Sequence, residues 1–195
     1  ELRGRRIGVE PGTSDILLLA SALRAHGIEP GEVREVFLTH PAKLGALAAG
    51  EVDAVCSYPP EAAETVRRTG ARVLFSSADV PGAIIDVLIA DAETIRTRSR
   101  ELAALVRANQ RAIDALRTDP AARRLVAERG RITTAELDQQ LAGMELPELA
   151  SQPSRFSRGG TVHLATEEAA RALRRYGAIS REPASGELLE EGVLR

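Results

Sequence analysis

The sequence has few of the residues that bind nucleic acid. Its 195 residues include no Trp, 2 Tyr and 3 Phe, so side chains that stack on bases are scarce. The formal net charge is -2, so the chain also lacks the excess of positive charge that attracts a phosphate backbone. Both shortages argue against nucleic acid as a partner.

Cysteine and histidine are also scarce. Cys56 is the only cysteine, so it forms no internal disulfide, and its place at the end of an apolar run is typical of a small buried residue. His26, His40 and His163 are too scattered for a ligand set, so we expect ordinary surface histidines and no metal site. The chain has neither a Walker A motif nor a dinucleotide fingerprint, and we predict no cofactor. No nucleophile, base and orienting group can be assembled either, so we expect no catalysis.

Long hydrophobic runs are missing as well. No stretch reaches the roughly 18 apolar residues that a membrane helix needs. The chain opens with ELRGRRIGVE, which contains neither a signal peptide nor an initiating Met, and we expect it to begin within a longer protein or after processing. Hydrophobic residues at 44% and charged residues at 28% are typical of a folded chain.

The first half of the chain alternates strand-like and helix-like segments. Short apolar runs are typical of buried strands, and the segments between them have helical periodicity and end at Gly. This alternation predicts an α/β fold with a mainly parallel sheet flanked by helices. The predicted strands are 5–10, 33–39, 52–58 and 71–77, with a fifth apolar run at 83–90, and the predicted helices are 15–27, 42–50 and 60–70.

The second half is predicted to be helical. Asp119 followed by Pro120 is typical of a helix start, and Thr133 with Glu136 forms a capping-box pattern. Residues 145–161 are rich in Pro, Ser and Gly and are predicted to form a loop. The predicted helices are 99–119, 119–130, 133–144 and 166–177.

The stretch GVEPGTSDILLL, residues 8–19, is the strongest candidate for a binding site. A strand breaks at Pro11-Gly12, and Thr13-Ser14 leads into a helix. The first N–H groups of a helix lack partners and attract anions, and in open α/β sheets ligands collect at the carboxyl ends of the strands. Tyr58 ends the third predicted strand at the same edge. Plain capping of the helix by Thr or Ser explains the pattern equally well, so both interpretations stay open.

Three segments share their order and spacing with one known family. The opening ELRGRRIGVEPGTS is similar to its "LkGkrIgv..Gts" strand and turn, and LGALAAGEVDAVCSYPPEAAE is similar to its "aaLaaGeiDAa..w.P" segment, with Tyr58 where Trp is frequent. PGAIIDVLIADAETI is similar to its return strand. From about Glu1 to about Asp119 the chain thus resembles the periplasmic substrate-binding proteins of ABC importers, in the nitrate, sulfonate, taurine and thiamine-precursor group.

The resemblance implies a periplasmic-binding-protein-like (type II) fold. Residues 1–85 would form the second lobe, and residues 86–195 the crossover strand and the helical C-terminal part of the first lobe. The β-α units that begin the first lobe in that family are absent here. We therefore expect half a binding site with weak affinity.

The same resemblance implies ligand-binding residues. Gly12, Thr13 and Ser14 would hold the acidic or polar head of a small solute, and Tyr58 would pack over it. Asp86 would lie near the hinge and bond a polar group of the ligand. The alternative for Asp86 is a strand residue that faces solvent.

The expected function is capture of a small solute without catalysis. The solute would be a sulfonate, nitrate, bicarbonate or a pyrimidine-like molecule, passed to an ABC transporter permease by a periplasmic or cell-surface lipoprotein. One alternative is a sensory or regulatory ligand-binding module, and a second is an enzyme of pyrimidine-precursor synthesis with the same fold.

Overall fold

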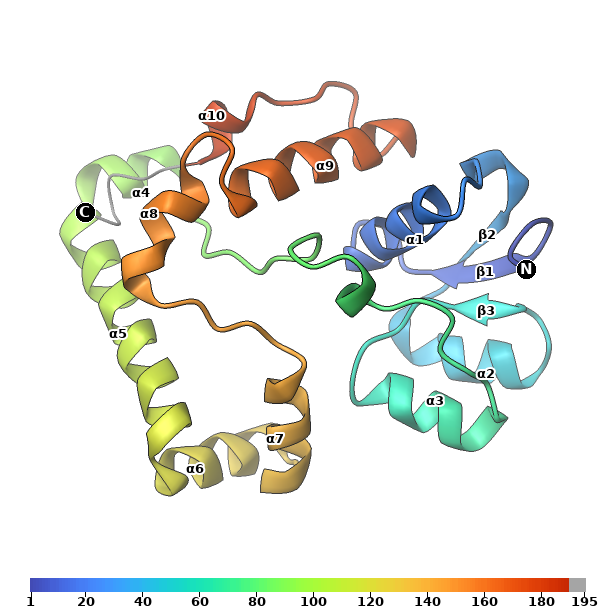
Figure 1. Cartoon of the computed structure of the whole chain (residues 1–195), viewed down its shortest axis with the longest axis horizontal. Coiled ribbons are helices and arrows are strands. Elements are labelled where there is room, and N and C mark those ends of the chain that lie inside the picture. Colours follow the sequence, from blue (N-terminus) through green and yellow to red (C-terminus); the bar gives the residue numbers. More distant parts are fainter. Residues whose placement is uncertain (190–195) are drawn as a thin grey trace. The chain divides into compact units, whose positions relative to one another are not determined.

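The computed structural model describes residues 1–189, which form two compact units (Figure 1). The first contains Glu1–Ile85 and Ala165–Ala184, and the second contains Asp86–Leu164 and residues 185–189. The sequence analysis expects two parts, 1–85 and 86–195, and the first boundary between the units follows Ile85. Residues 165–184 differ from that expectation, because they return to the first unit.

A small parallel sheet organises the first unit. Its three strands are β1 (Arg6–Val9), β2 (Arg34–Phe37) and β3 (Ala54–Val55), in the order β2-β1-β3. Both pairings are parallel, with Ile7 opposite Glu35 and Ala54. The apolar run around Ile7 forms the central strand because a strand with neighbours on both sides and helices on both faces is fully buried. The predicted α/β fold class with a parallel sheet is confirmed.

Each strand is followed by a helix. α1 (Ser14–Ala25) follows β1, α2 (Lys43–Ala48) follows β2, and α3 (Glu61–Thr69) follows β3. The chain moves outward from β1 to β2 and then back past β1 to β3, so right-handed crossovers put α1 and α2 on opposite faces of the sheet (Figure 1). Short 3-10 turns, η1 (Pro30–Glu32) and η2 (His40–Ala42), complete the connections.

The core of this unit lies between the sheet and α1. It includes Cys56, which is 8% exposed, as predicted for a small buried residue. Burial raises the pKa of the Cys56 thiol to about 12, so the thiol stays protonated at neutral pH. The buried members of the core are Ile7, Val9, Ile16, Leu19, Leu23, Ile28, Val33 and Cys56.

A helix from the second half of the chain completes this core. α9 (Thr161–Arg175) was expected over residues 166–177, and its last turns belong to the first unit. Leu173 and Tyr176 pack against the core, and Arg24 forms an ion pair with Glu168. The first unit is therefore built from two distant parts of the sequence.

Two predicted strands are wrong. Residues 71–77 and 83–90 have no strand conformation, apart from the start of the 3-10 turn η3 (Ser77–Asp79). Several of their large apolar side chains are exposed, with Val73 at 69% and Ile89 at 84%. A strand is stabilised by ladder hydrogen bonds to a neighbour, and within residues 1–189 neither run lies beside one. Apolar composition alone therefore did not determine their conformation.

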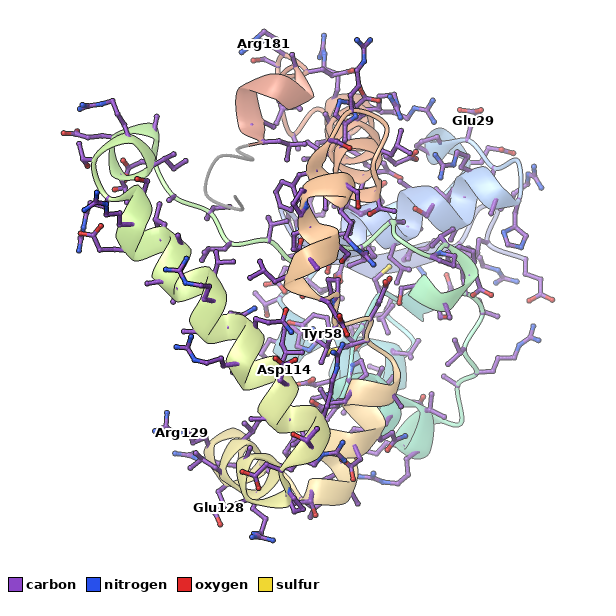
Figure 2. The ribbon with its side chains drawn as sticks, turned by 60° about the vertical axis from the view of Figure 1, so that its left-hand side comes forward. Glu29, Tyr58, Asp114, Glu128, Arg129 and Arg181 are labelled. Carbon is purple, nitrogen blue, oxygen red and sulfur yellow. The ribbon has the colours of Figure 1, made fainter. Side chains whose placement is uncertain are left out.

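The described part of the second unit is helical. α5 runs along it, and α6 contacts both α5 and α7 (Figure 1). Asp114, Glu128 and Arg129 lie exposed on α5 and α6 (Figure 2). The elements are α4 (Ala92–Thr97), α5 (Ser99–Thr118), α6 (Pro120–Gly130), α7 (Thr134–Ala142), η4 (Leu149–Ser151), α8 (Gln152–Phe156), the start of α9, and α10 (Ser185–Leu188).

The helix starts predicted at Asp119 and Thr133 are confirmed, whereas the start predicted at residue 166 is wrong, because α9 begins at Thr161. Asp119 accepts a hydrogen bond from the N–H of Ala121 at 2.8 Å, and Thr133 and Glu136 exchange the two bonds of a capping box. The loop expected at 145–161 is interrupted by η4 and α8. Proline is compatible with the first turn of α8 because the N–H that it lacks has no partner there. Within residues 1–189, no helix is both long and apolar enough to cross a membrane.

Candidate functional site

The carboxyl ends of the three strands gather the candidate residues of the first unit. β1 leads into the turn before Thr13, β2 leads to His40, and β3 leads to Tyr58. Because the strands are parallel, all three connections leave the sheet at one edge, with the turn after β1 in the middle. This is the edge at which open α/β sheets bind ligands.

Thr13 caps helix α1. Its hydroxyl donates a hydrogen bond to the carbonyl of Glu10 at 2.8 Å and accepts one from the N–H of Asp15 at 3.3 Å. Gly12 has a φ of +74°, a left-handed conformation that glycine adopts without strain. The Thr13 side chain therefore acts as a helix cap, and both of its hydrogen bonds are made within the turn. Ser14, the first residue of α1, is exposed.

The backbone of the same turn offers free donors. Among residues 1–189, no protein group accepts a hydrogen bond from the N–H of Gly12, Thr13 or Ser14. These three consecutive donors lie at the start of α1, where the helix dipole is positive. Capping and anion binding are thus compatible, because the cap uses a side chain and an anion would use the main chain.

A buried ion pair lies beneath the turn. Asp15 is 3% exposed and Lys43 is 2% exposed, and the ammonium of Lys43 donates to Oδ2 of Asp15. The same oxygen accepts a hydrogen bond from the N–H of Glu10 at 2.8 Å. One carboxylate therefore connects the end of β1, the first turn of α1 and the start of α2.

Sequence reasoning missed this pair. Asp two residues after a capping Thr is an ordinary first-turn residue, and Lys at the start of a short helix is usually solvated. The sequence contains no signal that relates the two, because 28 positions separate them. Only the packing of α2 near β1 brings Lys43 to the turn.

Tyr58 and His40 lie next to each other at this edge of the sheet. The two rings are stacked, with centroids 4.2 Å apart and planes 8° apart, and Tyr58 remains 48% exposed. The His40 side chain is only 13% exposed, so it is not the surface histidine that its scattered position suggested. His40 Nε2 lies 3.3 Å from Oε2 of Glu61. The pKa of Glu61 lies below its usual value because its backbone N–H, and secondarily His40, favour the charged form.

Asp86 belongs to a different unit from these residues. It is exposed, it occupies the irregular segment at 83–90, and it is the first residue of the second unit. Its expected contact with a ligand stays a prediction. Within residues 1–189, no three His, Cys, Asp or Glu side chains gather as a metal ion would require.

Fold and site together define a class: a parallel α/β domain with backbone donors and an aromatic ring at the carboxyl edge of its sheet. The chain belongs to the NMT1/THI5 like family, since a model of that family matches residues 1–123. This membership confirms the predicted relationship to the group that includes thiamine-precursor binding proteins.

Individual relatives are longer than this chain. A protein of Brachyspira hyodysenteriae, provisionally named an ABC transporter periplasmic binding protein, is 28% identical over 119 residues, which are 61% of this chain and 34% of the relative. The periplasmic aliphatic sulphonate binding protein SsuA of Escherichia coli has a similar fold, with a TM-score of 0.76 at 16% identity over 99% of this chain and 64% of its own. The alkanesulfonate-binding protein SsuA of Xanthomonas axonopodis pv. citri, bound to MOPS, gives 0.72 at 17% identity over 95% and 62%.

These structures confirm the predicted periplasmic-binding-protein-like fold. The chain spans about a third of the curated relative and less than two thirds of each solved structure. All three relatives are named as binding proteins.

Proposed function

We propose that the chain forms part of an extracytoplasmic solute-binding protein that captures a small anionic or polar organic solute for an ABC importer. The observation that carries the proposal is the set of three unpaired backbone N–H groups at Gly12, Thr13 and Ser14. An oxyanion placed there would accept hydrogen bonds from the main chain and gain from the dipole of α1. Sulfonate is the first candidate head group, because the two solved relatives are named for sulfonates.

The surrounding side chains suit a small organic ligand. Ser14 is exposed and carries one of the free N–H groups, and Tyr58 is 48% exposed. A hydroxyl adds a donor to an anionic head, and an aromatic ring adds apolar contact for the rest of the ligand. Asp86 remains a proposed contact for a polar group on the ligand.

The proposal also includes a periplasmic location, a transporter as the partner, and binding of the solute without catalysis. The relatives' names support a periplasmic site of action and delivery to a transporter. Burial raises the pKa of the Cys56 thiol to about 12, so this thiol is a poor nucleophile.

Titration of the ¹⁵N-labelled chain with methanesulfonate, nitrate, bicarbonate and an aminopyrimidine tests the proposal. We expect the amide signals of Gly12, Thr13 and Ser14 to shift with a Kd on the order of millimolar, since solvent-exposed charge-assisted bonds contribute about 1 kcal/mol each. Mass spectrometry after prolonged incubation should recover each compound unchanged. Turnover of the aminopyrimidine would instead favour the enzymatic alternative.

Helix α7 provides the matched control. Its N-terminus is closed by the capping box of Thr133 and Glu136, and Thr134 occupies the position that Ser14 has in α1. Ser14→Ala should weaken methanesulfonate binding by about fivefold, the value of one exposed hydrogen bond. Thr134→Ala should leave it unchanged. Equal shifts at both helix starts, or equal effects of both variants, would contradict a site at the turn.

A further inference from the structure

His40 joins the connections that follow two strands. It is the first residue of η2, after β2, and its ring stacks on that of Tyr58, which follows β3, with centroids 4.2 Å apart. Its Nε2 also lies 3.3 Å from Oε2 of Glu61, the first residue of α3. The imidazole therefore contacts both an aromatic ring and a carboxylate.

Both ring nitrogens of His40 are shielded from water. Within residues 1–189, neither nitrogen has a hydrogen-bond partner with suitable geometry, and the side chain is only 13% exposed. A neutral imidazole buried in this way leaves its donor and its acceptor unsatisfied. A protonated ring would be attracted to the carboxylate at 3.3 Å and to the negative face of the Tyr58 ring, which offsets the loss of solvation. Protonation of His40 therefore strengthens both of its contacts.

Glu61 is the charged group that acts most directly on His40. Lys43 at the start of α2 and Asp15 of α1 form a buried ion pair, so their charges cancel. Glu64 pairs with arginines of its own helix, α3. Within residues 1–189, the ion-pair partner of Glu61 is His40 alone. The backbone N–H of Glu61 lowers the pKa of its carboxyl group, so this group stays charged over the pH range in which imidazoles titrate.

We propose that His40 is a proton-sensitive positioning residue, whose protonated ring holds Tyr58 in place for the solute. This inference rests on the proposed function and adds a regulation of its site. Tyr58 stacks on His40 and is still 48% exposed, so part of its side chain remains available to a ligand. A ring that is held before the solute arrives loses less conformational entropy on binding. Solute affinity should therefore increase as the pH falls from about 8 to about 5.

Two sulfonates separate this role from a general effect of charge. Both stay ionised, but benzenesulfonate has a ring that can contact Tyr58, and methanesulfonate has none. NMR titration of the ¹⁵N-labelled chain should show benzenesulfonate binding about threefold tighter at about pH 5 than at about pH 8, the gain from ordering one side chain in advance. The affinity for methanesulfonate should hardly change. An equal pH effect on both sulfonates would overturn the inference, because a charge effect needs no contact with Tyr58.

Histidine variants identify the group that titrates. His40→Phe keeps an aromatic stack on Tyr58 but cannot be protonated, so its affinity for benzenesulfonate should not change with pH. Glu61→Gln removes the carboxylate beside His40 and should reduce the pH effect. His26→Phe is the matched control, because His26 lies in the same unit, at the end of α1, and its variant should keep the full effect. A pH effect in His40→Phe as large as in the original chain would overturn the inference.

A measurement without solute tests the inference apart from the proposed function. Carbon relaxation of the Tyr58 ring should show less motion at about pH 5 than at about pH 8 in the original chain, and no difference in His40→Phe. If neither sulfonate shifts an amide signal of the original chain, the proposed function fails, and the ring motion still decides the role of His40. Should His40→Phe not fold, as judged by its ¹⁵N spectrum, the original chain decides alone: equal motion at both pH values contradicts the proposal.

Discussion

The imidazole ring of His40 lies parallel to the phenol ring of Tyr58, with centroids 4.2 Å apart and planes 8° apart. The two residues follow different strands, so the stack joins two connections at the carboxyl edge of the sheet. One face of the Tyr58 ring is thereby covered, and the side chain is still 48% exposed. The stack holds a candidate ligand contact in place.

The energy of this stack is accessible to a double-mutant cycle. We expect His40→Leu and Tyr58→Leu to be coupled by about 1 kcal/mol in the free energy of unfolding, the usual contribution of an aromatic pair beyond its buried area. Urea unfolding of both single variants and the double variant measures the coupling. Glu61→Gln is the control for the contact between His40 Nε2 and Glu61. Additive effects of the two Leu substitutions would show that the stack contributes nothing.

Capping by Thr13 predicts a loss of stability. Thr13→Ala removes the acceptor for the N–H of Asp15 and the donor to the carbonyl of Glu10, so we expect the free energy of unfolding to fall by about 1 kcal/mol. Thr13→Ser keeps both bonds and should cost much less. Urea denaturation followed by circular dichroism compares the three proteins. Equal losses in both variants would assign the effect to the methyl group.

The contact between Arg6 and Asp53 predicts acid sensitivity. Two bonds from the Arg6 side chain, each 3.1 Å long, and one from its N–H at 2.8 Å lower the pKa of Asp53 from 3.8 to about 2. A depressed pKa stabilises the fold above the unfolded-state value, and this contribution disappears as the pH falls from about 4 to about 2. Asp53→Asn should therefore reduce stability at pH 6 and show a shallower loss of stability over that interval.

Unfolding by urea at several pH values measures this difference. Glu51→Gln is a suitable control, because Glu51 is an exposed residue in the same loop. Among residues 1–189, the Arg6 side chain donates to Asp53 and to the carbonyl of Gly50, and not to the Glu51 carboxylate. A variant Asp53→Asn with the acid profile of the original chain would refute the role of the contact.

Glu35 predicts the opposite pH dependence. Burial raises the pKa of Glu35 above its usual value, and the neighbouring hydroxyl of Tyr176 offsets part of the increase. The unfolded chain then releases this proton first, so the contribution of Glu35 to stability falls as the pH rises from about 4.5 through the raised pKa. Glu35→Gln should be more stable than the original chain at pH 7 and similar to it at pH 4. Thermal unfolding at both pH values is the measurement, and a variant less stable at pH 7 would contradict the prediction.

Local sequence signals were reliable where short-range physics decides the structure. The break at Pro11-Gly12, the cap at Thr13 and the capping box at Thr133 are set by dihedral preferences and hydrogen bonds within a few residues. The positions of the three paired strands were indicated by local apolar runs, but their pairing joins distant residues, such as Ile7 with Glu35 and Ala54. The turn as a candidate site could be found in this way, because the free N–H groups follow from the start of a helix.

Contacts between distant residues decided the rest. The apolar runs at 71–77 and 83–90 have the composition of strands, but a strand needs a neighbouring strand, and within residues 1–189 neither run has one. The burial of His40 and the pairing of Lys43 with Asp15 depend on how α2 and the connections after the strands pack near β1. The sequence by itself determined the α/β alternation and the turn, because these depend on neighbouring residues. Only the tertiary structure decided which charge faces that turn, because ion pairing depends on distance in space.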